Sequence, residues 1–384
     1  EASATVATKV GAGATLRAGP ASAISIRTLA NNQADAHAGG FGVGGILGVG
    51  VVLADARTAG STEALLDGDV LRAGALTVEA RASDNANSTA NALSGGILSG
   101  NGAVATATST PTIAARIAAG HQLRVGGDVA VTAVSENNAL SEANGIAAGA
   151  LSVGASIATS TTTPRISAAI DGGSVSSSGG SILVSALNNV DLSSGGVITV
   201  TGGGAKASTH ASAGGLLAGS GNQATAVSSP ILEASVGSSA SLAAAQDITL
   251  RSQSSNQADA GASGLAGGLV GVGINIASAT AAGANKAHLD GRVEAHPLAG
   301  GVDPERAGAS NVNIRAIGSD SANANAQAVA GGVAGVGDNR ATATVTPAVQ
   351  ASIGNGALLN VANNLKLEAR ETPEGDARDR KSVV

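Results

Sequence analysis

The side chains that could perform catalysis or bind a metal are few and scattered along this chain. Its five histidines are His37, His121, His210, His288 and His296. A zinc site or a catalytic triad needs several polar groups at a fixed spacing, and no histidine here has a His, Cys or carboxylate partner at a spacing that recurs. We therefore expect solvated histidines on loops or edges, with no catalytic residue, no metal ligand and no cofactor.

One local group of charged side chains lies near the fifth histidine. His296 is followed by Pro297, and Asp303 and Glu305 come shortly after. Proline and mixed charges are typical of a loop that protrudes into solvent. We interpret this group as an exposed loop.

Three glycine-rich segments superficially resemble loops that bind phosphate. They are residues 44–50 (GGILGVG), 267–273 (GGLVGVG) and 331–337 (GGVAGVG). A dinucleotide loop must be followed by a helix and by an acidic residue about 20 positions later, whereas each segment here leads into another strand-like run. Calcium-binding repeats of the RTX type need an Asp in a fixed register, which these segments lack. The sequence thus excludes both sites.

Threonine recurs at every second position in several runs, which permits another kind of site. If the runs stack, the hydroxyls could form a flat array that orders water or ice, although β-branched Thr also suits any solvated strand. The first and fifth copies interrupt the array, with Asp55 and Arg57 and with Asn275. A carbohydrate-active enzyme is the other alternative, but it would need clustered carboxylates, and these are scattered. The runs are Thr106, Thr108, Thr110 and Thr112; Thr159, Thr161 and Thr163; and Thr342, Thr344 and Thr346.

The composition argues against ordinary globular domains in this chain of 384 residues. It has no Cys, Met, Trp or Tyr, and Phe41 is its one aromatic residue, whereas conventional cores rely on aromatic side chains. The 56 glycines could suggest disorder, but 43% of the residues are hydrophobic, which is unlike a disordered chain. The formal net charge of −6 disfavours nucleic acid as a partner.

The same composition favours a location outside the cell. The absence of cysteine fits a cell-surface protein that is stable without disulfides. No secretion signal opens the sequence and no apolar run is long enough to form a transmembrane segment. We expect an internal or processed segment of a longer secreted protein.

Seven copies of one unit account for almost the whole sequence. Each copy begins with two apolar residues that flank one other residue, and the first members lie 52, 53, 53, 66, 64 and 53 residues apart. The longer spacings predict insertions near residues 190–202, which we interpret as an extra β-hairpin, and near residues 291–310, which we interpret as a protruding loop. The opening pairs are Ile24/Ile26, Leu76/Val78, Val129/Val131, Ile182/Val184, Ile248/Leu250, Val312/Ile314 and Leu365/Leu367.

Within a copy the pattern has a period of two, which is typical of strands. Ala258, Ala260 and Ala262 alternate with polar or small residues, and the run after the glycine bend alternates too. Such a unit cannot bury its apolar face alone, and a fixed period of this length indicates a solenoid. We predict an all-β fold: a parallel β-helix with wide flattened coils, a thin Ala/Gly-rich core and about 53 residues per repeat.

This solenoid is predicted to span residues 1–370 as a single domain. The charged residues 371–384 are expected to be a solvated tail or the start of a following segment. The sequence leaves open whether each repeat makes one coil or two of about 26 residues.

Two sets of residues could carry contacts. An Asn-bearing corner is expected before each alanine run, and stacked Asn side chains can form a ladder. An apolar ridge is expected at the glycine bends, either exposed as a contact site or folded inward as a plug of the core. The candidate ladder is Asn32, Asn85, Asn138, Asn189 and Asn256, and the candidate ridge is Phe41, Ile46, Leu47, Ile97, Leu98, Leu216, Leu217, Leu269 and Val270.

The repeats resemble a known family of surface proteins. DVAVTAVSENNALSEANG (128–145) and QDITLRSQSSNQADAGASGLAGGLVGVGINIASAT (246–280) are similar to repeats of large filamentous-haemagglutinin-like and leukotoxin LktA-type adhesins, which Gram-negative bacteria secrete by the two-partner route. The resemblance covers roughly residues 10–370. It implies a right-handed parallel β-helix shaft exported through an outer-membrane pore, and no binding residue carries over.

The sequence therefore predicts a non-catalytic structural or adhesive shaft of a bacterial surface or extracellular fibre. The expected partners are copies of itself or neighbouring segments of a longer chain, with a host-cell or matrix surface as a further candidate. A carbohydrate-active or ice-ordering β-helix that uses a stacked Thr face is the alternative.

Overall fold

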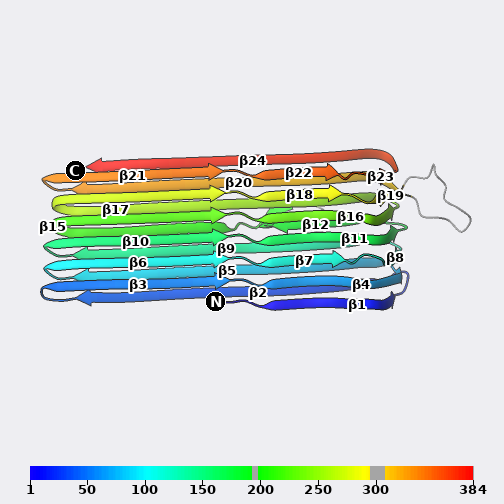
Figure 1. Ribbon diagram of the computed structural model, residues 1–384, viewed down its shortest axis with the longest axis horizontal. Coiled ribbons are helices and arrows are strands. Elements are labelled where there is room, and N and C mark those ends of the chain that lie inside the picture. Colours follow the sequence, from blue (N-terminus) through cyan, green and yellow to red (C-terminus); the bar gives the residue numbers. More distant parts are fainter. Residues whose placement is uncertain (193–197, 295–307, 384) are drawn as a thin grey trace, which may run out of the picture.

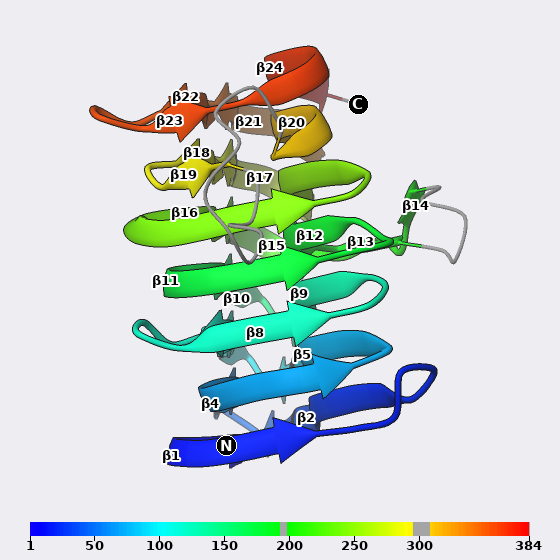
Figure 2. The ribbon, with the colours of Figure 1, turned by 90° about the vertical axis from the view of Figure 1, so that its right-hand side faces the viewer.

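Parallel β-strands form the whole of the described structure. The computed structural model describes residues 1–192, 198–294 and 308–383, and in this part of the chain every regular element is a strand. Apart from one short antiparallel hairpin, all pairings between the described strands are parallel. Figures 1 and 2 show the strands stacked in rows, from the N-terminal strand at one end to the C-terminal strand at the other.

One repeat makes one circuit, which we call a coil. In the first coil β2 (Ala23–Val43) runs outward, residues 44–46 reverse the chain, and β3 (Leu47–Thr58) and β4 (Ser61–Ala73) bring it back. The reversals lie together at one edge of the body, which we call the tip (left in Figure 1). The next coil begins at once with β5 (Ala75–Gly95) beside β2.

The other coils repeat this path. Before the first coil lies β1 (Thr5–Arg17). Beyond β5, the second coil has β6 (Leu98–Ser109), β7 (Thr112–Ile117) and β8 (Gln122–Val125); the third has β9 (Val129–Ala148), β10 (Leu151–Thr162) and β11 (Arg165–Ser177); and the fourth has β12 (Ile182–Asn188), β13 (Val190–Leu192), β14 (Ile198–Val200), β15 (Gly204–Ser228) and β16 (Ile231–Ala244). The fifth has β17 (Asp247–Ala281), β18 (Ala284–Leu289) and β19 (Arg292–Val293); the sixth has β20 (Ala309–Gly331), β21 (Ala334–Val345), β22 (Ala348–Ile353) and β23 (Leu358–Leu359); and β24 (Val361–Val383) is the last outgoing strand.

The strand register advances by one repeat at every step. Ile24 pairs with Leu76, Leu76 with Val129, and Val129 with Ile182, and the series continues in the same way. It passes through Ile248 and Val312 to Leu365. Each predicted strand start thus lies beside the next one, so each repeat makes one coil.

Two kinds of core lie between the outgoing and returning strands. Near the start of each coil, Val, Ile and Leu side chains such as Val131, Ile117 and Leu123 form a thick core. Toward the tip the buried cluster consists of alanine except for Val52. Ala258, Ala260 and Ala262 are all buried, which confirms that the alanine columns face inward.

The predicted Asn corner is wrong in most coils. β2, β5, β9, β17 and β20 run through this point without a break. The chain instead breaks on the facing side, between the two returning strands, as between Thr58 and Ser61. Asn256 lies opposite such a break, where its amide donates to the carbonyl of Ser228 at 3.0 Å. Asn256 thereby adds a side-chain contact across the core, since the Ser228 carbonyl also accepts the backbone N–H of Ala282 in the next coil at 2.9 Å.

The fourth coil is the exception, because its outgoing strand does break. Asn189 has a positive φ of 51°, a conformation that Asn tolerates. The predicted hairpin follows as β13 and β14, paired antiparallel from Val190 with Val200. Most of the second predicted insertion, with His296, Asp303 and Glu305, lies outside the described residues.

The charged C-terminal residues do not leave the body as a tail. β24 continues to Val383 and stays paired with β20. Residues 371–383 are therefore part of the last outgoing strand.

Candidate contact surface

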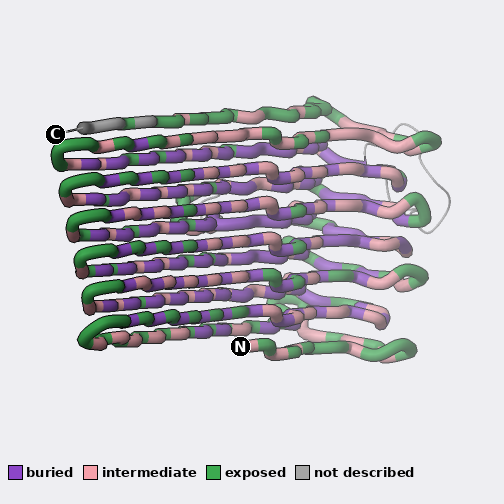
Figure 3. Tube along the Cα trace, turned by 60° about the vertical axis from the view of Figure 1, so that its left-hand side comes forward, coloured by how far each residue is buried: buried purple, intermediate pink, exposed green. Residues whose placement is uncertain are grey.

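The residues of the predicted ridge lie on the surface at the tip. Phe41 is 81% exposed and Ile46 is 70% exposed. Figure 3 shows the reversals as a continuous exposed border along one edge of the stack. The ridge therefore does not plug the core. Leu47, Ile97, Leu98, Leu216, Leu217, Leu269 and Val270 are exposed as well.

Glycine makes the tight reversal at the tip possible. A Cβ on Gly215 would lie 1.7 Å from the carbonyl oxygen of Gly149, one coil away, and a Cβ on Gly268 would lie 2.0 Å from that of Gly215. Successive reversals therefore stack with backbone against backbone, which no residue with a side chain permits. The bends carry their apolar side chains outward because their inner side has no room.

The ridge continues onto one broad face. We define the return face as the outer surface of β3, β6, β10, residues 217–228 of β15, residues 270–281 of β17, and β21. Leu47, Leu98, Leu151, Leu217 and Val270 form one column of this face, since each pairs with the next. Further apolar columns follow, and Val49, Val153 and Val272 are among their exposed members.

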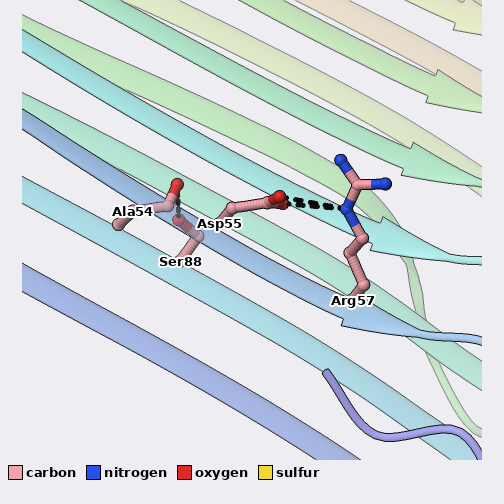
Figure 4. Close-up of polar contacts among 4 residues, drawn as sticks. All are labelled: Ala54, Asp55, Arg57 and Ser88. Carbon is pink, nitrogen blue, oxygen red and sulfur yellow. Dashed lines mark hydrogen bonds and ion pairs between the residues drawn. The ribbon is translucent and has the colours of Figure 1, made fainter.

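The threonine runs form columns on the same face. Thr106 pairs with Thr159, Thr159 with Thr225, Thr225 with Ser278, and Ser278 with Thr342. The first coil interrupts the columns, as its sequence indicates, but the expected interruption by Asn275 in the fifth coil is wrong, because Asn275 is buried. In the first coil Asp55 and Arg57 form an ion pair at 3.0 Å, while Ser88 reaches through the core to the Ala54 carbonyl at 2.9 Å (Figure 4).

The five residues of the predicted Asn ladder do not share one column. Asn32 pairs with Asp84, whereas Asn85 pairs with Gln33. Asn85 and Asn138 therefore belong to the neighbouring, outward column, where the Asn138 amide donates to Asn85 at 3.1 Å. The ladder prediction is wrong by one residue at these two positions, because adjacent residues of a strand face opposite sides.

The inner column contains both amides and carboxylates. Asn32 donates to Asp84 at 2.8 Å, the backbone N–H of Asn137 donates to the side chain of Asn189 at 2.9 Å, and Asn256 pairs in register with Asp320. Burial raises the pKa of Asp84, although the hydrogen bond from Asn32 opposes this effect. By sequence Asp84 and Asp320 belong to the expected Asn-bearing corner, but they were not included in the candidate ladder.

Asp320 is the most perturbed carboxyl group of this column. Burial is the main cause that raises its pKa to about 6, and repulsion from Glu371 adds to it, while Asn256 opposes it. Burial also raises the pKa of Glu371. The two carboxyls lie at the last pair of coils, where β20 meets β24.

The outer surface of the outgoing strands is polar and charged. A shallow groove of about 310 Å³ crosses it beside Asn138, Lys206 and Asp259. Its polar groups already bind one another: Gln257 and Asn323 both donate to Asp259 at 2.8 Å. The groove offers few free groups to a ligand.

The histidines do not come together in the described part of the chain. His121 lies 2.8 Å from Asp67, and His288 lies 3.5 Å from Glu233. Burial, with repulsion from Lys286, lowers the pKa of His288. Within the described ranges no cluster of three or more His, Cys, Asp or Glu side chains could hold a metal ion.

A stacked proline column was not predicted from the sequence. Pro111, Pro164 and Pro230 all stand at the break between the two returning strands, with Arg165 and Ile231 donating to the first two carbonyls at 2.9 Å. Proline suits this place because it needs no hydrogen-bond partner for its nitrogen. The sequence signal for this column was a proline that follows Thr or Ser at the same place in several repeats.

Comparisons with protein-family models, with curated proteins and with solved structures returned no match. The described residues contain no helix that is long and apolar enough to cross a membrane.

Proposed function

We propose that the chain is a β-solenoid, a parallel β-helix with one wide coil per repeat. It serves as a non-catalytic structural or adhesive shaft of a bacterial surface or extracellular fibre. The observation that carries the proposal is the unbroken register of one repeat per step, from Ile24 to Leu365. Stacked units of this kind give stiffness along one axis, since each unit contacts only its neighbours.

The distribution of side chains supports a mechanical role. The coils share their buried alanine positions, which let the two sheets approach closely. The coils differ mainly in their outward-facing residues and in their insertions. A shaft needs such an interior and a surface for lateral or end-to-end contacts, and the exposed ridge supplies one.

The resemblance to two-partner-secreted adhesins extends this proposal to a location. The protein would then be exported by a Gram-negative bacterium and contact either copies of itself, neighbouring segments of a longer chain, or a host-cell or matrix surface. The lack of cysteine is consistent with function outside the cell.

Cryo-electron microscopy of the purified chain tests the shaft. We expect flat particles that are widest along the strands, with a coil spacing of about 4.8 Å, and rods only where chains join end to end. A compact particle without this repeat would contradict the proposal. Binding of the chain to cultured host cells, compared with a variant lacking the apolar ridge, would separate an adhesive role from a purely structural one.

An ice-ordering surface is the second candidate function. The continuous hydroxyl column from Thr106 through Thr159, Thr225 and Ser278 to Thr342 favours it. Ice growth in the presence of the protein is the direct measurement, with Thr159→Lys as the disrupting variant. Normal ice growth with the unmodified chain would remove this candidate.

A further inference from the structure

One face of the body carries no charge over its four central coils. On the return face, β6, β10, residues 217–228 and residues 270–281 contain no Asp, Glu, Lys, Arg or His. The outgoing strands of the same coils carry charges such as Glu142, Lys206 and Asp259, and the remaining face carries Arg116 and Glu233. An uncharged stretch of this size differs from an ordinary solvated surface.

The uncharged area is apolar from the tip to its middle. Val153, Ile157, Ile274 and Ile276 are all exposed there. Farther from the tip its outward residues are mainly Thr and Ser, which can meet another surface without an unpaired charge. Exposed apolar patches larger than a few hundred Å² mark interaction sites.

The size of this area matches what a stable dimer needs. Four strands spaced about 4.8 Å apart, each of twelve residues at about 3.3 Å, cover roughly 800 Å². A standard interface buries about 800 Å² on each partner. The first and sixth coils bound the area with charged residues, Asp55 and Arg57 at one end and Asp338 and Arg340 at the other.

The shape of the area identifies its occupant. Figure 1 shows the strands of successive coils as straight rows, side by side, so the area is a regular sheet surface. A second sheet with the same strand spacing fits such a surface, since sheets pack face to face at about 10 Å. The area has no cation that would attract an anionic membrane or a polyanion.

We propose that the return face binds the return face of a second copy of this chain, in a two-fold symmetric dimer. A two-fold contact uses the same patch on both subunits, and the central coils meet without opposing charges. This inference rests on the proposed function in one respect: the dimer would be the lateral contact between two shafts. Pairing would double the thickness of the body and cover the exposed apolar residues of the central return face.

Sedimentation velocity over a range of protein concentrations tests the dimer. We expect a monomer–dimer equilibrium whose dissociation constant rises at least tenfold in Ile157→Lys, which places a charge in the middle of the face. The matched control is Leu140→Lys, in the same coil but on the outgoing face. The two residues are similarly exposed, 41% for Ile157 and 39% for Leu140, so the control should leave the equilibrium unchanged.

Cross-linking gives an independent measurement if Ile157→Lys fails to fold. The chain has no cysteine, so Thr159→Cys provides a single attachment point for a flexible bismaleimide. We expect covalent dimers from Thr159→Cys and none above background from Leu140→Cys at the same concentration.

Three outcomes would overturn the dimer: a chain that stays monomeric at all concentrations, a dimer that Ile157→Lys leaves intact, or monomers that bind neutral phosphatidylcholine vesicles through this face. Each is distinguishable from failure of the shaft, because a monomeric particle with the coil spacing intact would retain the stacked coils and remove only the dimer.

Discussion

At the residue scale, the fold depends on how small the interior side chains are. Alanine at the inward positions near the tip, together with buried Ser and Asn such as Ser156 and Asn222, lets two sheets pack with only short side chains between them. Polar side chains such as Asn256 lie inside opposite a break in the facing strand, where Asn256 donates to a backbone carbonyl across the core. Size and hydrogen bonding at single positions therefore decide whether a coil closes.

Replacing an inward alanine by tryptophan should prevent closure. Ala260→Trp should destabilise the fold by at least about 3 kcal/mol, because overpacking forces the sheets apart. Chemical denaturation followed by circular dichroism measures the change. Ser263→Trp, at an outward position of the same strand, is the control. An Ala260→Trp variant as stable as this control would contradict the thin core.

The buried carboxyl of Asp320 should make stability depend on pH. Its pKa in the folded chain is about 6, above the ordinary value of 3.8, so the folded state keeps a proton that the unfolded state releases. The contribution of Asp320 to stability is therefore largest below about pH 4 and is lost as the pH rises to about 6, by up to about 3 kcal/mol at about 1.4 kcal/mol per pH unit.

Asp320→Asn should remove most of this dependence and be more stable than the natural chain at pH 7. Part of the slope should persist, because the pKa of Glu371 is raised as well. Denaturation midpoints from pH 4 to pH 7 measure the effect. The assignment fails if the variant keeps the full slope, or if the outward Asp259→Asn changes it as much.

At the element scale, the tip reversals limit which sequences can form a coil. Each bend stacks on the bend of the neighbouring coil, so a glycine such as Gly215 or Gly268 has no room for a Cβ. The same constraint directs the apolar bend residues outward and creates the ridge. The reversal thus determines both the closure of the coil and its contact surface.

Two adjacent glycines allow this constraint to be tested. Gly215→Ala should cost about 1–3 kcal/mol, because the new methyl group would collide with the Gly149 carbonyl. At Gly214 a Cβ would meet no atom within 4 Å, so Gly214→Ala should be neutral within about 0.5 kcal/mol. Equal effects in thermal denaturation would show that the bends do not stack as described.

At the scale of the whole molecule, the coils behave as interchangeable layers. The columns that join the second coil to the third continue into the fourth, from Leu76 through Val129 to Ile182. Stability in such a body is a sum of terms within and between neighbouring units. Removing a layer should therefore shorten the body without changing its architecture.

Deletion of residues 129–181, one complete coil, should give a folded protein. Leu76 would then pair with Ile182, and the body would shorten along the stack by about 4.8 Å. Circular dichroism and electron microscopy check the fold and the length. Deletion of residues 129–148 alone removes an outgoing strand and shifts the register, so it should unfold the chain; the same behaviour of both deletions would contradict the layered architecture.

The sequence by itself determined the strands, the repeat and the register, because a two-residue alternation and a fixed period leave few ways to bury methyl groups. It predicted the series of paired strand starts from Ile24 to Leu365 and the inward alanine columns. Where two adjacent residues are both polar and similar in size, as Asp84 and Asn85 are, the alternation did not predict which of the two faces inward.

Only the tertiary structure decided what the returning strands place opposite each outgoing strand. Contacts between segments far apart in the sequence determine three features: the number of coils per repeat, the strand break opposite Asn256, and the outward direction of the ridge. The charge-free area of the return face also emerges only on stacking, because its columns collect single residues from successive coils. The two-residue period determines on which side of its strand a residue lies. Packing between segments distant in the sequence determines whether that side is buried in the core or exposed on a face.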